Sequence, residues 1–87
     1  MQAQESPTDS IRQVRRRYQE ELMSKANVVG VGIGFRQRGG ERTGEPALVV
    51  LVRRKLPPDQ IAPQDMIPTY LEGVPVDVQE VGDLRAF

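Results

Sequence analysis

The chain of 87 residues contains no cysteine, no histidine and no tryptophan. Without cysteine it can form neither a disulfide bond nor a thiolate nucleophile. Without histidine it lacks the commonest metal ligand and the commonest general base of enzymes. These absences exclude disulfide scaffolds and cysteine enzymes, and they exclude every catalytic or metal site that depends on an imidazole.

The chain also lacks a long apolar run. No stretch reaches the length that a membrane-spanning helix needs, and the amino-terminal residues MQAQESPTDS have neither the basic patch nor the apolar run of a secretory signal. We therefore expect a cytoplasmic protein with no membrane contact.

The twelve basic and twelve acidic residues balance overall but are distributed unevenly. Residues 1–55 contain eleven Lys or Arg and six Asp or Glu, whereas residues 56–87 contain one and six, so the two parts carry +5 and −5. Such asymmetry steers association more than it stabilises a fold, and it can be satisfied within a folded monomer or between subunits.

The length predicts a single domain with a thin core, because small chains bury a smaller fraction of their surface. We expect residues 1–5 to be a disordered tail and residues 6–87 to form one small α+β domain. A helix is predicted from about Thr8 to Lys25, with a start signal at Ser6 and Pro7. Apolar residues then recur at helical spacing, namely Ile11, Val14, Tyr18, Leu22 and Ala26.

Two strands joined by a glycine-rich turn are predicted at about Val28–Gln37 and Glu45–Leu56. In the first strand, glycine occupies every second position. Successive side chains of a strand point to opposite faces, so one face would carry Val29, Val31, Ile33 and Phe35. The other face would be nearly bare, with Gly30, Gly32 and Gly34. A bare face lets another element or another chain approach the backbone closely.

The second strand is apolar on both faces. Ala47, Val49 and Leu51 lie on one face, and Leu48, Val50 and Val52 on the other. Such a strand is normally buried on both sides, but one helix can cover only one of them. The remaining face is either an interaction surface or is sealed by the proline-rich stretch that follows. We predict an interaction surface on Val29, Val31, Ile33 and Phe35 or on Ala47, Val49 and Leu51, with close backbone approach at Gly30, Gly32 and Gly34.

From Leu56 to Gly73, four prolines rule out a long regular element, although Asp59–Ile61 and Gln64–Met66 could each form one helical turn. Residues 74–79 alternate apolar and polar side chains, which predicts a third strand. Pro75 cannot donate a ladder hydrogen bond, so we expect this strand at the sheet edge. The predicted fold is α+β: an N-terminal helix packed on a three-stranded, mainly antiparallel sheet, with Val28–Gln37 in the middle and a proline-rich connection before the last strand.

The alternating glycines superficially resemble a phosphate-binding loop. A dinucleotide site needs its glycines at a turn from strand to helix, where the helix amino terminus faces the pyrophosphate. Here the glycines lie inside a strand and a hairpin follows. Close backbone packing is therefore the favoured interpretation.

Two basic clusters could attract phosphate backbones: Arg12, Arg15, Arg16 and Arg17 on the helix, and Arg53, Arg54 and Lys55 after the second strand. Tyr18 is the only aromatic residue near the first cluster, and the balanced overall charge is not that of a nucleic-acid-binding protein. We interpret both clusters as solvated surfaces. The acidic residues are dispersed, without calcium or zinc spacing, and no base activates a serine. We predict no enzyme activity, no cofactor, no metal and no nucleic-acid partner.

Several motifs in order resemble a known family. They are NVVGVGIGF, the turn residues Gly39, Gly40, Thr43, Gly44 and Glu45, the segment VRRKLP (52–57), the pair Ile67-Pro68, and LEGVPVDVQEVG (71–82). Residues 27–85 are similar to the leader-like domain that precedes the trypsin-like (chymotrypsin-fold) serine peptidase domain in a family of bacterial proteins. The catalytic residues of such proteins lie downstream, so the resemblance implies a leader role only: packing on the peptidase-like domain, shielding it or organising its oligomer.

The leading functional hypothesis is a non-catalytic protein-interaction module that docks through an apolar sheet face onto a trypsin-like domain or onto itself. One alternative is a free-standing protein that self-assembles, with sheet faces or edges paired across a symmetry axis. Another is a peptidase inhibitor that acts in trans.

Overall fold

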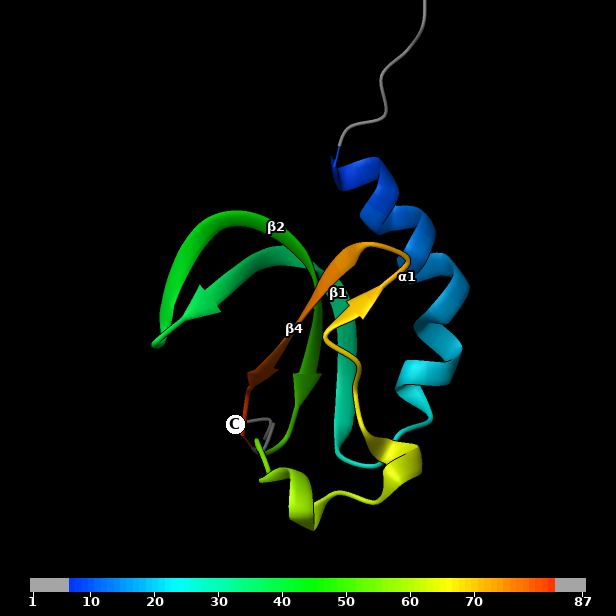
Figure 1. Cartoon of the computed structure of the whole chain (residues 1–87), viewed down its shortest axis with the longest axis vertical. Helices are drawn as coiled ribbons and strands as arrows, with labels where there is room; N and C mark the ends of the chain where they lie inside the picture. Colours follow the sequence, from blue (N-terminus) through cyan, green and yellow to red (C-terminus); the bar gives the residue numbers. More distant parts are fainter. Residues whose placement is uncertain (1–6, 83–87) are drawn as a thin grey trace, which may run out of the picture.

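The computed structural model describes residues 7–82 (Figure 1). The predicted tail (residues 1–5) and Ser6 lie outside these residues. The elements are α1 (Pro7–Met23), β1 (Val28–Arg38), β2 (Glu41–Val52), the single 3₁₀ turns η1 (Pro58–Gln60) and η2 (Pro63–Asp65), β3 (Tyr70–Leu71) and β4 (Val74–Glu80). In this part of the chain, no helix combines the length and the apolar character needed to cross a membrane.

The four strands form one sheet in the order β1-β2-β4-β3. β1 and β2 are antiparallel, β3 and β4 are antiparallel, and β2 and β4 are parallel. The α+β class is confirmed, but the predictions of three strands and of a central Val28–Gln37 strand are wrong. β4 joins the free side of β2, so the doubly apolar β2 is interior and β1 lies at an edge, in keeping with burial of β2 on both faces.

β4 is not the edge strand that Pro75 predicted, because it lies between β2 and the two-residue β3. Pro75 is opposite Tyr70 of β3, and the ladder with β2 begins one residue later, at Val76. The missing N–H of Pro75 therefore falls outside the ladder with β2. A proline at the start of a strand does not require that strand to be an edge.

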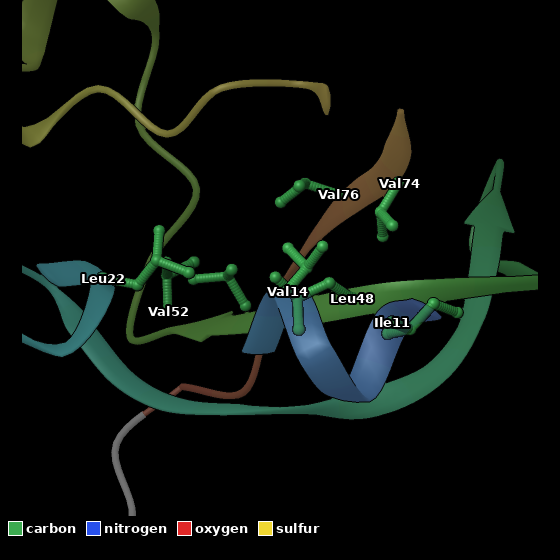
Figure 2. Packing of buried hydrophobic residues seen from close by; sticks show 8 residues of the cluster. Ile11, Val14, Leu22, Leu48, Val52, Val74 and Val76 are labelled. Carbon is green, nitrogen blue, oxygen red and sulfur yellow. The ribbon is translucent and has the colours of Figure 1, made fainter. Parts of the chain in front are cut away.

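Helix α1 packs its apolar stripe against one face of the sheet, as its spacing predicted. Figure 2 shows side chains of α1, β2 and β4 that point toward one another in this core. Its buried members are Ile11, Val14, Leu22, Leu48, Val50, Val52, Val74 and Val76. Ala26 is exposed, because α1 ends at Met23. The chain turns there: the Lys25 N–H donates to the Leu22 carbonyl, and Asn27 has a left-handed φ of 77°.

The proline-rich connection (residues 53–69) contains the two expected helical turns, each beginning one residue earlier than predicted. It is tied to the end of α1: Lys25 Nζ donates to the Gln64 carbonyl at 2.8 Å, and the Ala26 N–H donates to Asp65 Oδ1 at 3.0 Å. Ile67 packs on the core beneath α1. The connection thus extends the helix side of the sheet.

Candidate functional site: the open face of the sheet

The strand register separates the two faces of the sheet. Gly30, Gly32 and Gly34 of β1 lie opposite Leu51, Val49 and Ala47 of β2, and Val49 and Leu51 lie opposite Asp77 and Gln79 of β4. These eight residues share the face that points away from α1, which we call the outer face. It combines the bare glycine positions with one apolar side of β2.

The four predicted apolar residues of β1 do not form one exposed surface. Val31 and Ile33 lie opposite Val50 and Leu48 and pack against the core beneath α1. Val29 falls in a register irregularity between Val28 and Gly30. This β-bulge inserts one residue, which interrupts the period of two that the prediction assumed. The four side chains therefore do not share one exposed face, and an interaction surface on them stays a prediction.

The apolar side of β2 is partly covered by the chain itself. Ala47 is fully buried and Val49 is 7% exposed, whereas Leu51 is half-buried. An added Cβ at Gly30 would lie 3.2 Å from Cδ1 of Leu51, and one at Gly34 would lie 3.0 Å from Cγ2 of Val49. The close backbone approach predicted at these two glycines is thus made by side chains of β2.

Gly32 differs from its two neighbours. A Cβ added at Gly32 would meet no atom within 4 Å. The position opens into a hollow of about 420 Å³ on the outer face. This outer hollow is lined by Gly32, Ile33, Gly34, Phe35, Gln37, Arg42, Val49, Leu51 and Gln79. None of residues 53–69 lines it, so the proline-rich connection leaves this part of the outer face uncovered.

Polar groups of β4 hold the far end of β1 beside the outer hollow. The Gln79 side chain donates from Nε2 to the Phe35 carbonyl at 3.1 Å and to Asp77 Oδ2 at 2.9 Å. The same Asp77 oxygen accepts the Gln37 N–H at 3.0 Å. Arg42 places its guanidinium 4.3 Å from the centroid of the Phe35 ring. The lining of the hollow therefore combines amide, aromatic and cationic groups with apolar side chains.

A second hollow, of about 290 Å³, lies between the proline-rich connection and the sheet. Its lining includes Val52, Ile61, Ile67 and Val78, and two further lining residues, Leu56 and Met66, are 37% and 41% exposed. Sequence reasoning missed this hollow, because the prolines indicated only irregular structure. The apolar residues between the prolines were the signal that could have indicated it.

Three arginines of α1 make contacts within the domain. Arg12 pairs with Asp9 at 3.4 Å, Arg15 donates to Gln19 at 3.1 Å, and Arg17 donates to Glu72 in the turn between β3 and β4. The hydrogen bond from Arg17, and then that from Tyr18, lower the pKa of Glu72. Among residues 7–82, no three acidic side chains gather closely enough to hold a metal ion.

A family model described as the NARROW LEAF 1 N-terminal domain matches residues 10–81. The chain belongs to this family. The match covers α1 from residue 10 onward and all of the strands β1 to β4. No curated protein matches the chain.

The family assignment corrects the resemblance drawn from the sequence. The prediction of a leader domain from bacterial trypsin-like peptidases is wrong, because the matching family is named for NARROW LEAF 1 of plants. The motifs behind that prediction correspond to structural elements. NVVGVGIGF covers the bulged start of β1, and GVPVDVQ covers β4 with the turn before it. Such motifs are constrained by strand pairing and turns, which do not specify the partner of a domain.

Proposed function

We propose that this chain is a non-catalytic protein-interaction domain that docks a partner protein against its outer face around Gly32. The observation that carries the proposal is the empty space at this glycine. Glycine weakens a strand interior and is used where another backbone or ligand approaches closely. Gly30 and Gly34 accommodate Leu51 and Val49, but no described residue of the chain occupies the corresponding space at Gly32.

The composition of the outer hollow supports a protein partner. Apolar Val49 and Leu51 contribute to its floor, while Phe35 and Arg42 stack beside it. Aromatic and arginine side chains are enriched at protein interfaces and often dominate their binding energy. No observation favours the inhibitor alternative, which stays a prediction.

Site-specific photocrosslinking tests the proposal. The photoreactive amino acid p-benzoylphenylalanine replaces Phe35, which lines the outer hollow, in cells that naturally produce the chain. The matched control places the same group at Tyr70, which is 55% exposed on β3 and does not line the hollow. We expect a discrete adduct with a protein from position 35 and none from position 70. Mass spectrometry then identifies the partner.

A second variant separates docking from folding. Gly32→Val fills the space at Gly32, and the open hollow leaves room for the added methyl groups. We expect the position-35 adduct to disappear in this background while the melting temperature stays unchanged or rises. Equal adducts from positions 35 and 70, no adduct at all, or an adduct that persists in the folded Gly32→Val variant would overturn the proposal.

A further inference from the structure

β1 lies at an edge of the sheet and carries few of the features that protect such edges. Among residues 7–82, it is paired with one strand, β2, and lies at the end of the strand order. Proteins commonly protect such edges with charged residues, prolines or bulges. From Val28 to Phe35 the strand contains no charged residue and no proline, and its register irregularities lie at the two ends of this run. Along the regular part between them, β2 is the one strand that pairs with β1 among the described residues.

The sequence of this edge is symmetric about Gly32. Residues 29–35 read apolar, Gly, apolar, Gly, apolar, Gly, apolar. In an antiparallel pair of two copies centred on Gly32, each Gly32 lies opposite the other, Gly30 lies opposite Gly34 of the second copy, and Val31 lies opposite Ile33 of the second copy. Every glycine then meets a glycine and every apolar residue meets an apolar one, which is the self-complementarity that a two-fold interface requires.

We propose that two copies of this chain pair antiparallel through β1 about a two-fold axis at Gly32. This inference goes beyond the proposed function, because it concerns the edge of β1 rather than the outer face, and its partner is a second copy of the chain. The two four-stranded sheets become one sheet with the strand order β3-β4-β2-β1-β1-β2-β4-β3. Because the register keeps like faces together, both α1 helices lie on one side and the two outer hollows adjoin on the other.

The charges and the backbone partners fit this register. Arg36 falls opposite Val28 of the second copy, so like charges do not face each other in the pair, where they would be destabilising. The carbonyl of Phe35 and the N–H of Gln37 are already bonded by Gln79 and Asp77. The stretch available for pairing is therefore Gly30–Gly34, which contains the symmetric centre.

The absence of cysteine makes a register test possible with one substitution. In a Gly32→Cys variant, the two cysteines of the pair lie directly opposite, with Cα atoms about 4.5–5.5 Å apart. This separation suits a disulfide, which joins Cα atoms about 4.4–6.8 Å apart. Gly44→Cys is the matched control, since Gly44 also has no atom within 4 Å of an added Cβ. Gly30→Cys tests the register, because position 30 of one copy lies opposite position 34 of the other. The two cysteines at position 30 would then be separated by four residues, about 13 Å along the strand.

The unmodified chain is first measured by light scattering over a range of concentrations, and we expect a concentration-dependent dimer. On oxidation with glutathione disulfide, we expect Gly32→Cys to convert almost completely to a species of twice the chain mass, with at least tenfold less from Gly44→Cys and Gly30→Cys. A monomer at all concentrations, or equal crosslinking of the three variants, would overturn self-pairing. If the chain is monomeric and the Phe35 adduct contains another protein, self-pairing is wrong and the proposed function stands. If neither assay finds a partner, both fail.

Discussion

Arg17 on α1 donates hydrogen bonds to both carboxylate oxygens of Glu72, at 2.5 and 2.6 Å, and so joins the helix to the turn between β3 and β4. Glu72 has a left-handed φ of 50° in that turn. The pair links residues that are 55 positions apart in the sequence. It connects the amino-terminal helix directly to the hairpin that carries β4.

The Arg17–Glu72 pair predicts a pH dependence of stability. The hydrogen bond from Arg17 holds the pKa of Glu72 below its usual value in the folded protein. A depressed carboxylate pKa stabilises the fold above the unfolded pKa, and this contribution is lost as the pH falls through the folded pKa. We therefore expect Glu72→Gln to have a lower melting temperature than the unmodified chain at pH 7. The difference in melting temperature should disappear at acidic pH, because Glu72 is then protonated and as neutral as the glutamine that replaces it.

Melting curves between pH 2.5 and pH 7 measure this difference. Glu20→Gln serves as the control, because Glu20 is an exposed acidic residue of α1. The effect should be small, since exposed ion pairs contribute little. A Glu72→Gln difference that is the same at both ends of the pH range would contradict the role assigned to the ionised carboxylate.

Asn27 predicts a second effect, on the junction between α1 and β1. Its side chain donates from Nδ2 to the Arg54 carbonyl and accepts the Arg54 N–H at 3.1 Å, while its backbone has a φ of 77°. Asn27→Ala loses both side-chain bonds and also strains the left-handed backbone, whereas Asn27→Gly loses only the bonds. We expect Asn27→Ala to lower the free energy of unfolding by about 2–4 kcal/mol. Asn27→Gly should be the milder change, with a loss smaller by about 1–2 kcal/mol.

Urea unfolding at neutral pH gives both free energies. The comparison isolates the backbone term, because the two variants remove the same hydrogen bonds. If Asn27→Gly were as unstable as Asn27→Ala, the left-handed conformation would not be a source of strain at this position.

Two glycines of β1, Gly32 and Gly34, should respond differently to replacement by alanine. Gly34→Ala places a methyl group 3.0 Å from Cγ2 of Val49, and overpacking of this kind costs about 1–3 kcal/mol. Gly32→Ala meets no neighbour, and replacing glycine without strain stabilises a fold by about 0.4–1 kcal/mol. Denaturant unfolding of the two variants should therefore give changes of opposite sign.

A double variant checks the cause of the Gly34 effect. Val49→Ala removes the methyl group that would collide, so Gly34→Ala should cost less in the Val49→Ala background than in the unmodified chain. Additive free-energy changes would show that the clash with Val49 is not the reason.

The sequence predicted the elements that depend on local patterns. The helical spacing of Ile11, Val14 and Leu22 placed all three in the core, and the glycines of the hairpin turn led to a pair in the left-handed region, Gly39 and Gly40. The two-residue β3 was missed, because two residues are too few to show an alternation of apolar and polar side chains. The strand order was also missed, since the pairing of β2 with β4 depends on contacts between residues far apart in the chain.

By itself, the sequence determined the helix, the long hairpin, the last strand and the glycine alternation of β1, because each follows from the periodicity of neighbouring residues. Only the tertiary structure decided which glycine matters for contact. Leu51 and Val49 of β2 fill the space beside Gly30 and Gly34, whereas the space at Gly32 stays open. That distinction depends on the register between two strands and on the bulge at Val29, which no local pattern of side chains encodes.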